Sequence, residues 1–248
     1  MTPESLIPLL IAPFVGSFLG VVIDRLPNGE PVLLGRSRCD CCARALRPAE
    51  LLPLISYACR LGRCGCGETR LRPFHPLIEL SALAVALSAV IATAGWLLVV
   101  SLYLGWSLLA LAVIDQRHFI LPDSLTLPLI PMGLAVAWTI DPGRIVPHLL
   151  GVIAGFLAFA AIGWLYRNLR GQDGLGLGDA KLLAAAGAWL GWQALPGVVG
   201  LASAAGLAIA LLHAAGGRPM DGRSAIAFGP YLALALWLVW LAGPVLPS

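Results

Sequence analysis

Eight apolar runs occupy most of this 248-residue chain and constrain its fold more than any other feature. A helix needs about 20 apolar residues to cross the hydrocarbon core of a bilayer, and all but the short sixth run approach that length. The runs are approximately Leu6–Ile23, Leu77–Ala94, Trp96–Ile114, Ser124–Ile140, Val146–Tyr166, Ala180–Trp192, Leu195–His213 and Pro230–Val245. The chain is 59% hydrophobic and only 12% charged, which excludes an ordinary soluble enzyme, a disordered chain and a nucleic-acid binder. We therefore predict an all-α polytopic membrane protein with about eight transmembrane helices.

The basic residues predict how this protein is oriented. Of the 16 lysines and arginines, nine lie between Arg25 and Arg72, and only Arg144 falls in a loop of the opposite parity. The positive-inside rule then places both termini outside and the large first loop in the cytoplasm. The first run lacks a preceding basic segment and a small-x-small cleavage site, so we interpret it as a retained span and not as a signal peptide.

Three domains follow from this pattern. Residues 1–23 form the first transmembrane helix, residues 24–76 a small cysteine-rich cytoplasmic domain, and residues 77–248 a membrane domain of seven helices. A domain of about 50 residues has too little core to be stable without a further cross-link or metal.

All six cysteines lie in the predicted cytoplasmic domain, where a reducing environment disfavours disulfides. Two close clusters about 20 residues apart suggest a tetrahedral zinc site, which would help to order a small domain. The predicted ligands are Cys39, Cys42, Cys64 and Cys66. Cys64 and Cys66 have the less favourable CxC spacing, so Cys41 or Cys59 is an alternative ligand. Free thiols that pack as small hydrophobic groups, or a redox pair, remain open.

Two aspartates at the ends of predicted spans are the candidate catalytic residues. Asp115 directly follows the third run and Asp179 directly precedes the sixth, which places both at the cytoplasmic face. Two neighbouring carboxyl groups can share a proton, so that one activates water and the other polarises a peptide carbonyl. Gly176 and Gly178 would let a substrate backbone approach closely. Ion coupling is an alternative for the pair, as are an N-cap role for Asp179 and a helix-end role for Asp115 near Arg117.

Two further carboxylates are predicted to be structural. Asp123, directly before Ser124, is expected to be an N-cap. Glu79 lies early in the second predicted span, and we expect it to pair with an arginine of the large loop.

These residues, taken in order along nearly the whole chain, resemble the bacterial prepilin peptidases. The similar segments are Gly16–Pro27, with Gly20 where the family usually has Asn; Ser37–Cys42; Leu52–Ser56; Gly62–Cys64; His75–Glu79; Ile114–Asp115 with Leu121–Asp123; Gly176–Asp179 followed by Lys181; and Phe228–Tyr231. The segment Gly176–Asp179 resembles the GxGD motif, and Cys64–Cys66 is one residue shorter than the second CxxC of the family.

The resemblance implies a membrane aspartic endopeptidase with Asp115 and Asp179 as its catalytic pair. Its substrates would be type IV prepilins or type II secretion pseudopilins, cut after a Gly at the cytoplasmic face of the bacterial inner membrane. Many members also methylate the new N-terminus with S-adenosylmethionine, and the cysteine-bearing loop accompanies that activity. The expected partners are these substrates and membrane lipid, with no nucleic acid. No residue that binds the methyl donor is recognisable.

Two interpretations from other classes remain open. Facing carboxylates could serve a proton- or cation-coupled carrier, although both aspartates lie at one membrane edge instead of near the midplane. A structural, zinc-bearing assembly subunit would explain the cysteines but would leave the aspartates without a role.

Overall fold

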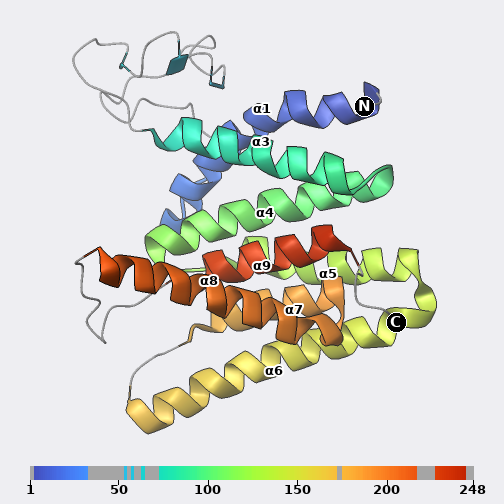
Figure 1. Ribbon diagram of the computed structural model, residues 1–248, viewed down its shortest axis with the longest axis vertical. Helices are drawn as coiled ribbons and strands as arrows, with labels where there is room; N and C mark the ends of the chain where they lie inside the picture. The colour runs from blue at the N-terminus through green and yellow to red at the C-terminus, as the bar shows by residue number, and fades with distance from the viewer. Residues whose placement is uncertain are drawn as a thin grey trace. The chain divides into compact units, whose positions relative to one another are not determined.

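The structure, a computed structural model, describes residues 3–32, 53–54, 57–58, 63–64, 73–171, 175–216 and 227–243. Within these ranges the protein is almost entirely helical, and each of the eight predicted apolar runs coincides for most of its length with one α-helix (Figure 1). The helices are α1 (Pro3–Arg25), α3 (Phe74–Ala92), α4 (Trp96–His118), α5 (Asp123–Ile140), α6 (Ile145–Arg170), α7 (Leu177–Leu190), α8 (Leu195–Ala215) and α9 (Gly229–Ala242). The prediction of an all-α polytopic membrane protein is confirmed.

Six of these helices, and not eight, are long and apolar enough to cross a bilayer in the described part of the chain. The other two, α7 and α9, have 14 residues each. A 14-residue helix is about 21 Å long, whereas the hydrocarbon core is about 30 Å thick. Glycines limit α7 at both ends, because Gly176 is its N-cap and Gly191, at φ +80°, is its C-cap.

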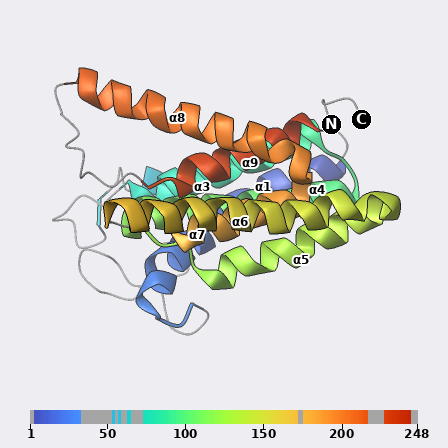
Figure 2. The ribbon, with the colours of Figure 1, turned by 90° about the horizontal axis from the view of Figure 1, so that it is seen from below.

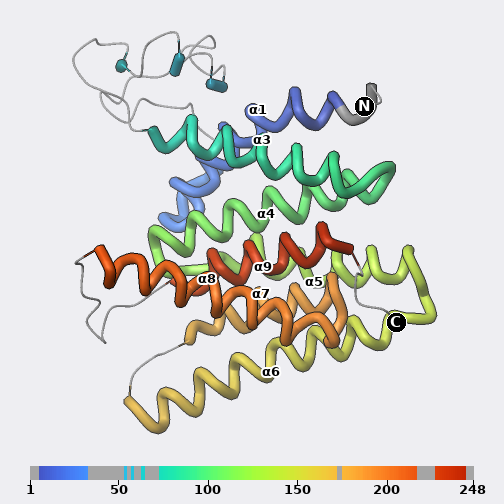
Figure 3. Tube along the Cα trace, in the orientation of Figure 1, coloured from blue at the N-terminus to red at the C-terminus, as the bar shows by residue number. Residues whose placement is uncertain are grey.

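The chain divides into two compact units, Met1–Ala110 and Leu111–Ser248. In the first unit α1 packs along α3 (Figure 3). Gly16 makes this close packing possible, since a Cβ atom there would lie 2.6 Å from the Cα atom of Glu79. Most of the predicted cysteine-rich domain lies outside the described residues.

Glu79 is buried in the first unit and has several partners among the described residues. Its Oε2 atom accepts a 2.7 Å hydrogen bond from the backbone N–H of Leu54. Within the described residues its further partners are the Ser17 hydroxyl and the charge of His75. Most arginines of the large loop lie outside the described residues, so the expected pairing of Glu79 with one of them stays a prediction.

Gly20 lies beside His75 in the same part of the first unit. A Cβ atom on Gly20 would come within 2.7 Å of His75 Nδ1. The His75 ring therefore occupies the space that a larger residue at position 20 would need, which gives a physical reason for glycine at this position.

Helix α7 is the central element of the second unit and packs against α5, α6 and α9 (Figures 1 and 2). Against α6, Gly151 faces Gly187, and a Cβ atom on Gly151 would lie 2.6 Å from the Gly187 carbonyl oxygen. Small residues of this kind let membrane helices approach at backbone distance. Against α5, the Trp189 indole donates a 2.8 Å hydrogen bond to the carbonyl of Leu129. All residues from Leu182 to Trp189 are buried, so protein and not lipid surrounds most of α7.

Candidate active site

Asp115 lies one turn before the end of α4 and is 6% exposed. Its Oδ2 atom accepts a 3.0 Å hydrogen bond from the backbone N–H of Gly229, the first residue of α9. Only glycine fits at that position, because a Cβ atom on Gly229 would lie 2.7 Å from Asp115 Oδ2. The start of α9 therefore holds the Asp115 carboxylate directly with its backbone.

Asp179 is the third residue of α7, and the N-cap of this helix is Gly176. The interpretation of Asp179 as an N-cap is therefore wrong. Its carboxylate instead accepts a hydrogen bond from the backbone of Gly176, as in a capping box, where the third residue reaches back to the N-cap N–H. The Oδ1 atom of Asp179 is buried and has no hydrogen-bond partner among the described residues. A buried carboxylate oxygen without a partner is unusual and points to a group that binds something else.

The second unit brings the two aspartates together. Their carboxyl groups are near enough for the charge of Asp115 to act on Asp179. Each also lies at a helix N-terminus, Asp179 in the first turn of α7 and Asp115 against the first N–H of α9. The positive ends of two helix dipoles thus favour negative charge at a site where two carboxylates would otherwise repel each other. This arrangement is suited to a pair that holds one proton and one negative charge.

Gly178 has a packing role that the sequence did not predict. A Cβ atom there would lie 2.9 Å from Leu121 Cβ, in the segment that precedes α5. Gly176 lies beside the carboxylate, since its Cβ would be 3.4 Å from Asp179 Oδ2. Gly178 therefore lets the first turn of α7 pack closely on the segment before α5, and Gly176 leaves space for the Asp179 carboxylate beside it.

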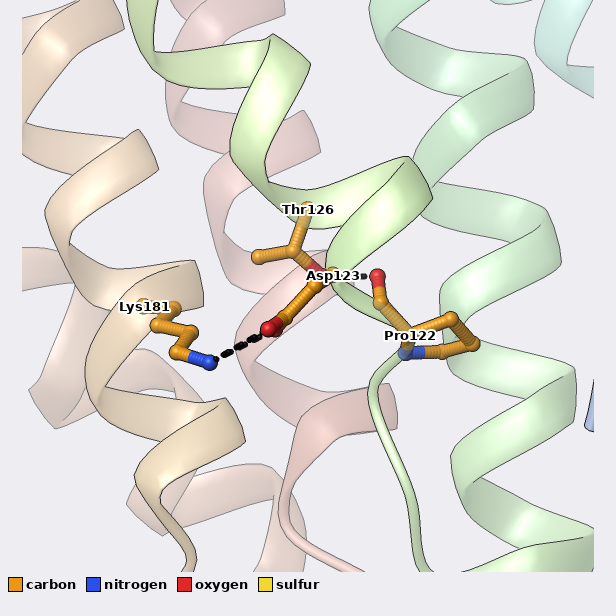
Figure 4. Close-up of polar contacts among 4 residues, drawn as sticks. All are labelled: Pro122, Asp123, Thr126 and Lys181. Carbon is orange, nitrogen blue, oxygen red and sulfur yellow. Dashed lines mark hydrogen bonds and ion pairs between the residues drawn. The ribbon is translucent and has the colours of Figure 1, made fainter.

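Next to this pair, Asp123 and Lys181 form an ion pair between α5 and α7 (Figure 4). The Lys181 Nζ atom lies 2.6 Å from Oδ1 and 2.9 Å from Oδ2 of Asp123. The expected N-cap role of Asp123 is wrong, because Pro122 is the N-cap of α5 and Asp123 is its first residue. The Thr126 hydroxyl donates a 3.0 Å hydrogen bond to the Pro122 carbonyl and stabilises the same turn.

Two features of the site were missed by the sequence analysis. The hydrogen bond from Gly229 uses a backbone N–H, which every residue except proline carries, so residue type gave no signal for it. The Asp123–Lys181 pair joins residues 58 positions apart, and their opposite charges alone did not predict the contact. Both residues did lie in segments noted for their family resemblance.

The predicted zinc site falls largely outside the described residues. Cys39, Cys42 and Cys66 lie in undescribed segments, and Cys64 is described and buried at 4% exposure. Where the chain is described, no group of three or more His, Cys, Asp or Glu side chains could hold a metal. The zinc ligands therefore remain a prediction.

The fold and the site together define an all-helical membrane protein with two interacting carboxyl groups at helix ends. Residues 102–211, which include both aspartates, match the model of the type IV leader peptidase family, and residues 10–93 match the bacterial peptidase A24 N-terminal domain. No solved structure matches the chain significantly.

Proteins that are similar to this chain over most of their length support the same family. A prepilin leader peptidase/N-methyltransferase of Burkholderia pseudomallei (strain 1026b) is 41% identical, over 88% of this chain and 79% of the relative. Proteins with the same name from Pseudomonas aeruginosa and Pseudomonas putida are 35% and 36% identical, over 95% and 98% of this chain and 89% and 93% of theirs. The chain belongs to the type IV leader peptidase family and is a peptidase. The family favours this class over a carrier or an assembly subunit.

Proposed function

We propose that this protein cleaves the leader of type IV prepilins or type II secretion pseudopilins, using Asp115 and Asp179 as an aspartic catalytic pair. The observation that carries the proposal is the meeting of two carboxyl groups at the N-termini of α7 and α9, one with an unpartnered buried oxygen. The relatives named above are prepilin leader peptidases, which supports this substrate class.

The chemistry follows from the different surroundings of the two carboxyl groups. The Asp115 carboxylate is held by the N–H of Gly229, whereas Asp179 keeps one oxygen free to bind water or the substrate. The ionised carboxylate takes a proton from water as the water oxygen attacks the peptide carbon, and the protonated carboxyl gives its proton to the carbonyl oxygen. When the tetrahedral intermediate breaks, the C–N bond is lost and the amine leaves with a proton.

We further propose that α7 and α9 are the sixth and eighth transmembrane segments and that the site opens to the cytoplasm. Both helices are about 9 Å shorter than the hydrocarbon core, and both begin at the candidate site. Their short length would allow water to reach the aspartates below the membrane surface. The substrate would place its apolar helix among the spans and its basic leader in the cytoplasm, with the scissile bond after a Gly. The proposed location is the bacterial inner membrane, with both termini outside.

A second activity, N-methylation of the new N-terminus, is also proposed. The printed names of the relatives include N-methyltransferase, and residues 10–93 match the N-terminal domain of the family. S-adenosylmethionine would supply the methyl group, and we assign no residue to its binding. Zinc bound by Cys39, Cys42, Cys64 and Cys66 would order the loop, and a zinc content of about one per chain that falls on Cys39→Ser would support this.

The test uses the full chain in lipid nanodiscs with a prepilin-like peptide, whose basic leader ends in Gly before an apolar helix that starts with Phe. We expect the wild-type protein to cleave after that Gly, and Asp115→Asn and Asp179→Asn to lose at least about 1000-fold in kcat/KM. Mass spectrometry identifies the cut and, when S-adenosylmethionine is added, the methyl group.

Asp141→Asn is the matched control. Asp141 caps a short 3₁₀ turn between α5 and α6 and pairs with Arg144 at 3.4 Å in an exposed loop. The control should cleave as the wild type does. Cleavage at the wild-type rate by either Asp115→Asn or Asp179→Asn would disprove the catalytic pair.

A further inference from the structure

Two chain segments, residues 115–123 and 179–181, are joined by the Asp123–Lys181 ion pair and by the interaction of Asp115 with Asp179. Together they form a closed ring of covalent and non-covalent contacts. Asp115 is followed along the chain by the segment that leads to Asp123, and Lys181 comes two residues after Asp179. The ion pair joins these two segments on one side, while the carboxyl groups of Asp115 and Asp179 interact on the other. The ring thus has a contact that can set the spacing of the two carboxyl groups.

Further contacts make this ring stiff. Leu121, within the first segment, packs so closely on Gly178 that a Cβ atom on the glycine would lie 2.9 Å from Leu121 Cβ. Behind the ion pair, Thr126 is fully buried and holds the Pro122 carbonyl. Lys181 contacts both oxygens of Asp123, so the orientation of the carboxylate is fixed as well as its distance (Figure 4).

The ion pair is too exposed to be explained by stability alone. The side chains of Lys181 and Asp123 are 29% and 55% exposed. Exposed ion pairs contribute little to the free energy of folding. In contrast, a displacement of about 1 Å in a catalytic group can lower the rate about 100-fold. A contact beside Asp179 can therefore matter much more for catalysis than for folding.

We propose that Asp123 and Lys181 are positioning residues that set the distance between the Asp115 and Asp179 carboxyl groups. The inference rests on the proposed function and deepens it. Lys181 acts on the first turn of α7, and Asp123 acts on the segment that continues from α4. Neither residue touches the reacting atoms in this account.

The test compares four variants in nanodiscs with the same prepilin-like peptide: Asp123→Asn, Lys181→Met, the double variant of these two, and the charge exchange Asp123→Lys with Lys181→Asp. We expect each single variant to lower kcat about 10- to 100-fold and to change KM less than about 2-fold. The double variant should be no slower than the slower single variant, because both remove the same contact. The charge exchange should recover at least about 10-fold of the lost kcat.

Thermal unfolding of the same samples separates positioning from folding, with Asp141→Asn as the matched ion-pair control. The single variants should unfold within about 2 °C of the wild type, as the control does. Wild-type kcat in both single variants, or losses that multiply in the double variant without recovery in the exchange, would overturn the inference. If Asp115→Asn and Asp179→Asn are inactive in that case, the proposed function stands and only the positioning role fails. If those two variants are active, the proposed function itself fails.

Discussion

The backbone N–H of Gly229 donates a 3.0 Å hydrogen bond to Asp115 Oδ2, and this contact links the start of α9 to the end of α4. A Cβ atom on Gly229 would lie 2.7 Å from that oxygen and 3.0 Å from Asp115 Cγ. Neither neighbour is the end of a long, flexible side chain, so the carboxylate or the helix must move.

Gly229→Ala should therefore lower cleavage strongly. We expect kcat/KM for the prepilin-like peptide to fall about 10- to 100-fold, because the added methyl group displaces the Asp115 carboxylate from its partner. Gly200→Ala in α8 is the matched control, since its Cβ atom would meet nothing within 4 Å. Equal activity of Gly229→Ala and Gly200→Ala would show that the hydrogen bond does not position Asp115.

Among the described residues, the hydrophobic pattern was sufficient to locate the long α-helices but not every helix end. Each of the eight apolar runs coincides largely with one α-helix, because a segment in the bilayer must satisfy its backbone hydrogen bonds internally. The start of α7 was predicted at Ala180, whereas the helix begins at Leu177. Gly178 and Asp179 are not apolar, and their place in the first turn depends on close packing with Leu121 and on the backbone hydrogen bond to Gly176. The contact with Leu121 is tertiary and is not visible in the local sequence, whereas the bond between Asp179 and Gly176 is local but was not predicted.

Gly151→Ala should destabilise the second unit. The new Cβ atom would lie 2.6 Å from the carbonyl oxygen and 2.9 Å from the Cα atom of Gly187, both of which are backbone atoms that cannot rotate away. We expect a loss of about 1–3 kcal/mol, the usual cost of overpacking. Thermal unfolding in nanodiscs measures this effect, and the Gly200→Ala control should not show it. An unchanged unfolding temperature for Gly151→Ala would mean that α6 and α7 pack less closely than described.

Gly20→Asn should disturb the first unit, although the related family usually has Asn at this position. Its Cβ atom would lie 2.7 Å from His75 Nδ1, so the imidazole ring has to leave its place. We expect the unfolding temperature to fall in Gly20→Asn and to recover when His75→Ala is added, since the smaller side chain vacates the space. If Gly20→Asn and the double variant are equally destabilised, a clash with His75 is not the cause. Because Asp115 and Asp179 lie in the other unit, both variants should keep peptide cleavage within about 3-fold of the wild type.

Phe119 allows a test of whether the segment between α4 and α5 must keep its backbone conformation. Phe119 has φ +55°, in the left-handed region that side chains with a Cβ atom rarely adopt. Its backbone N–H donates a 2.9 Å hydrogen bond to the carbonyl of Asp115, so this turn directly follows the proposed catalytic residue. Asparagine tolerates the left-handed region, whereas β-branched valine does not.

Phe119→Asn should therefore keep the stability and cleavage of the wild type. Phe119→Val should lower the folding free energy, because a β-branched side chain is strained in the left-handed region, and should lose about 10-fold in kcat, because relief of that strain would shift the segment that joins Asp115 to Asp123. The Phe119 side chain is 56% exposed, so loss of packing would affect both variants to a similar extent and cannot explain a difference between them. Equal kcat values for the Asn and Val variants would show that the backbone of this turn does not control the spacing of the aspartates, and the ion pair between Asp123 and Lys181 would then have to act without it.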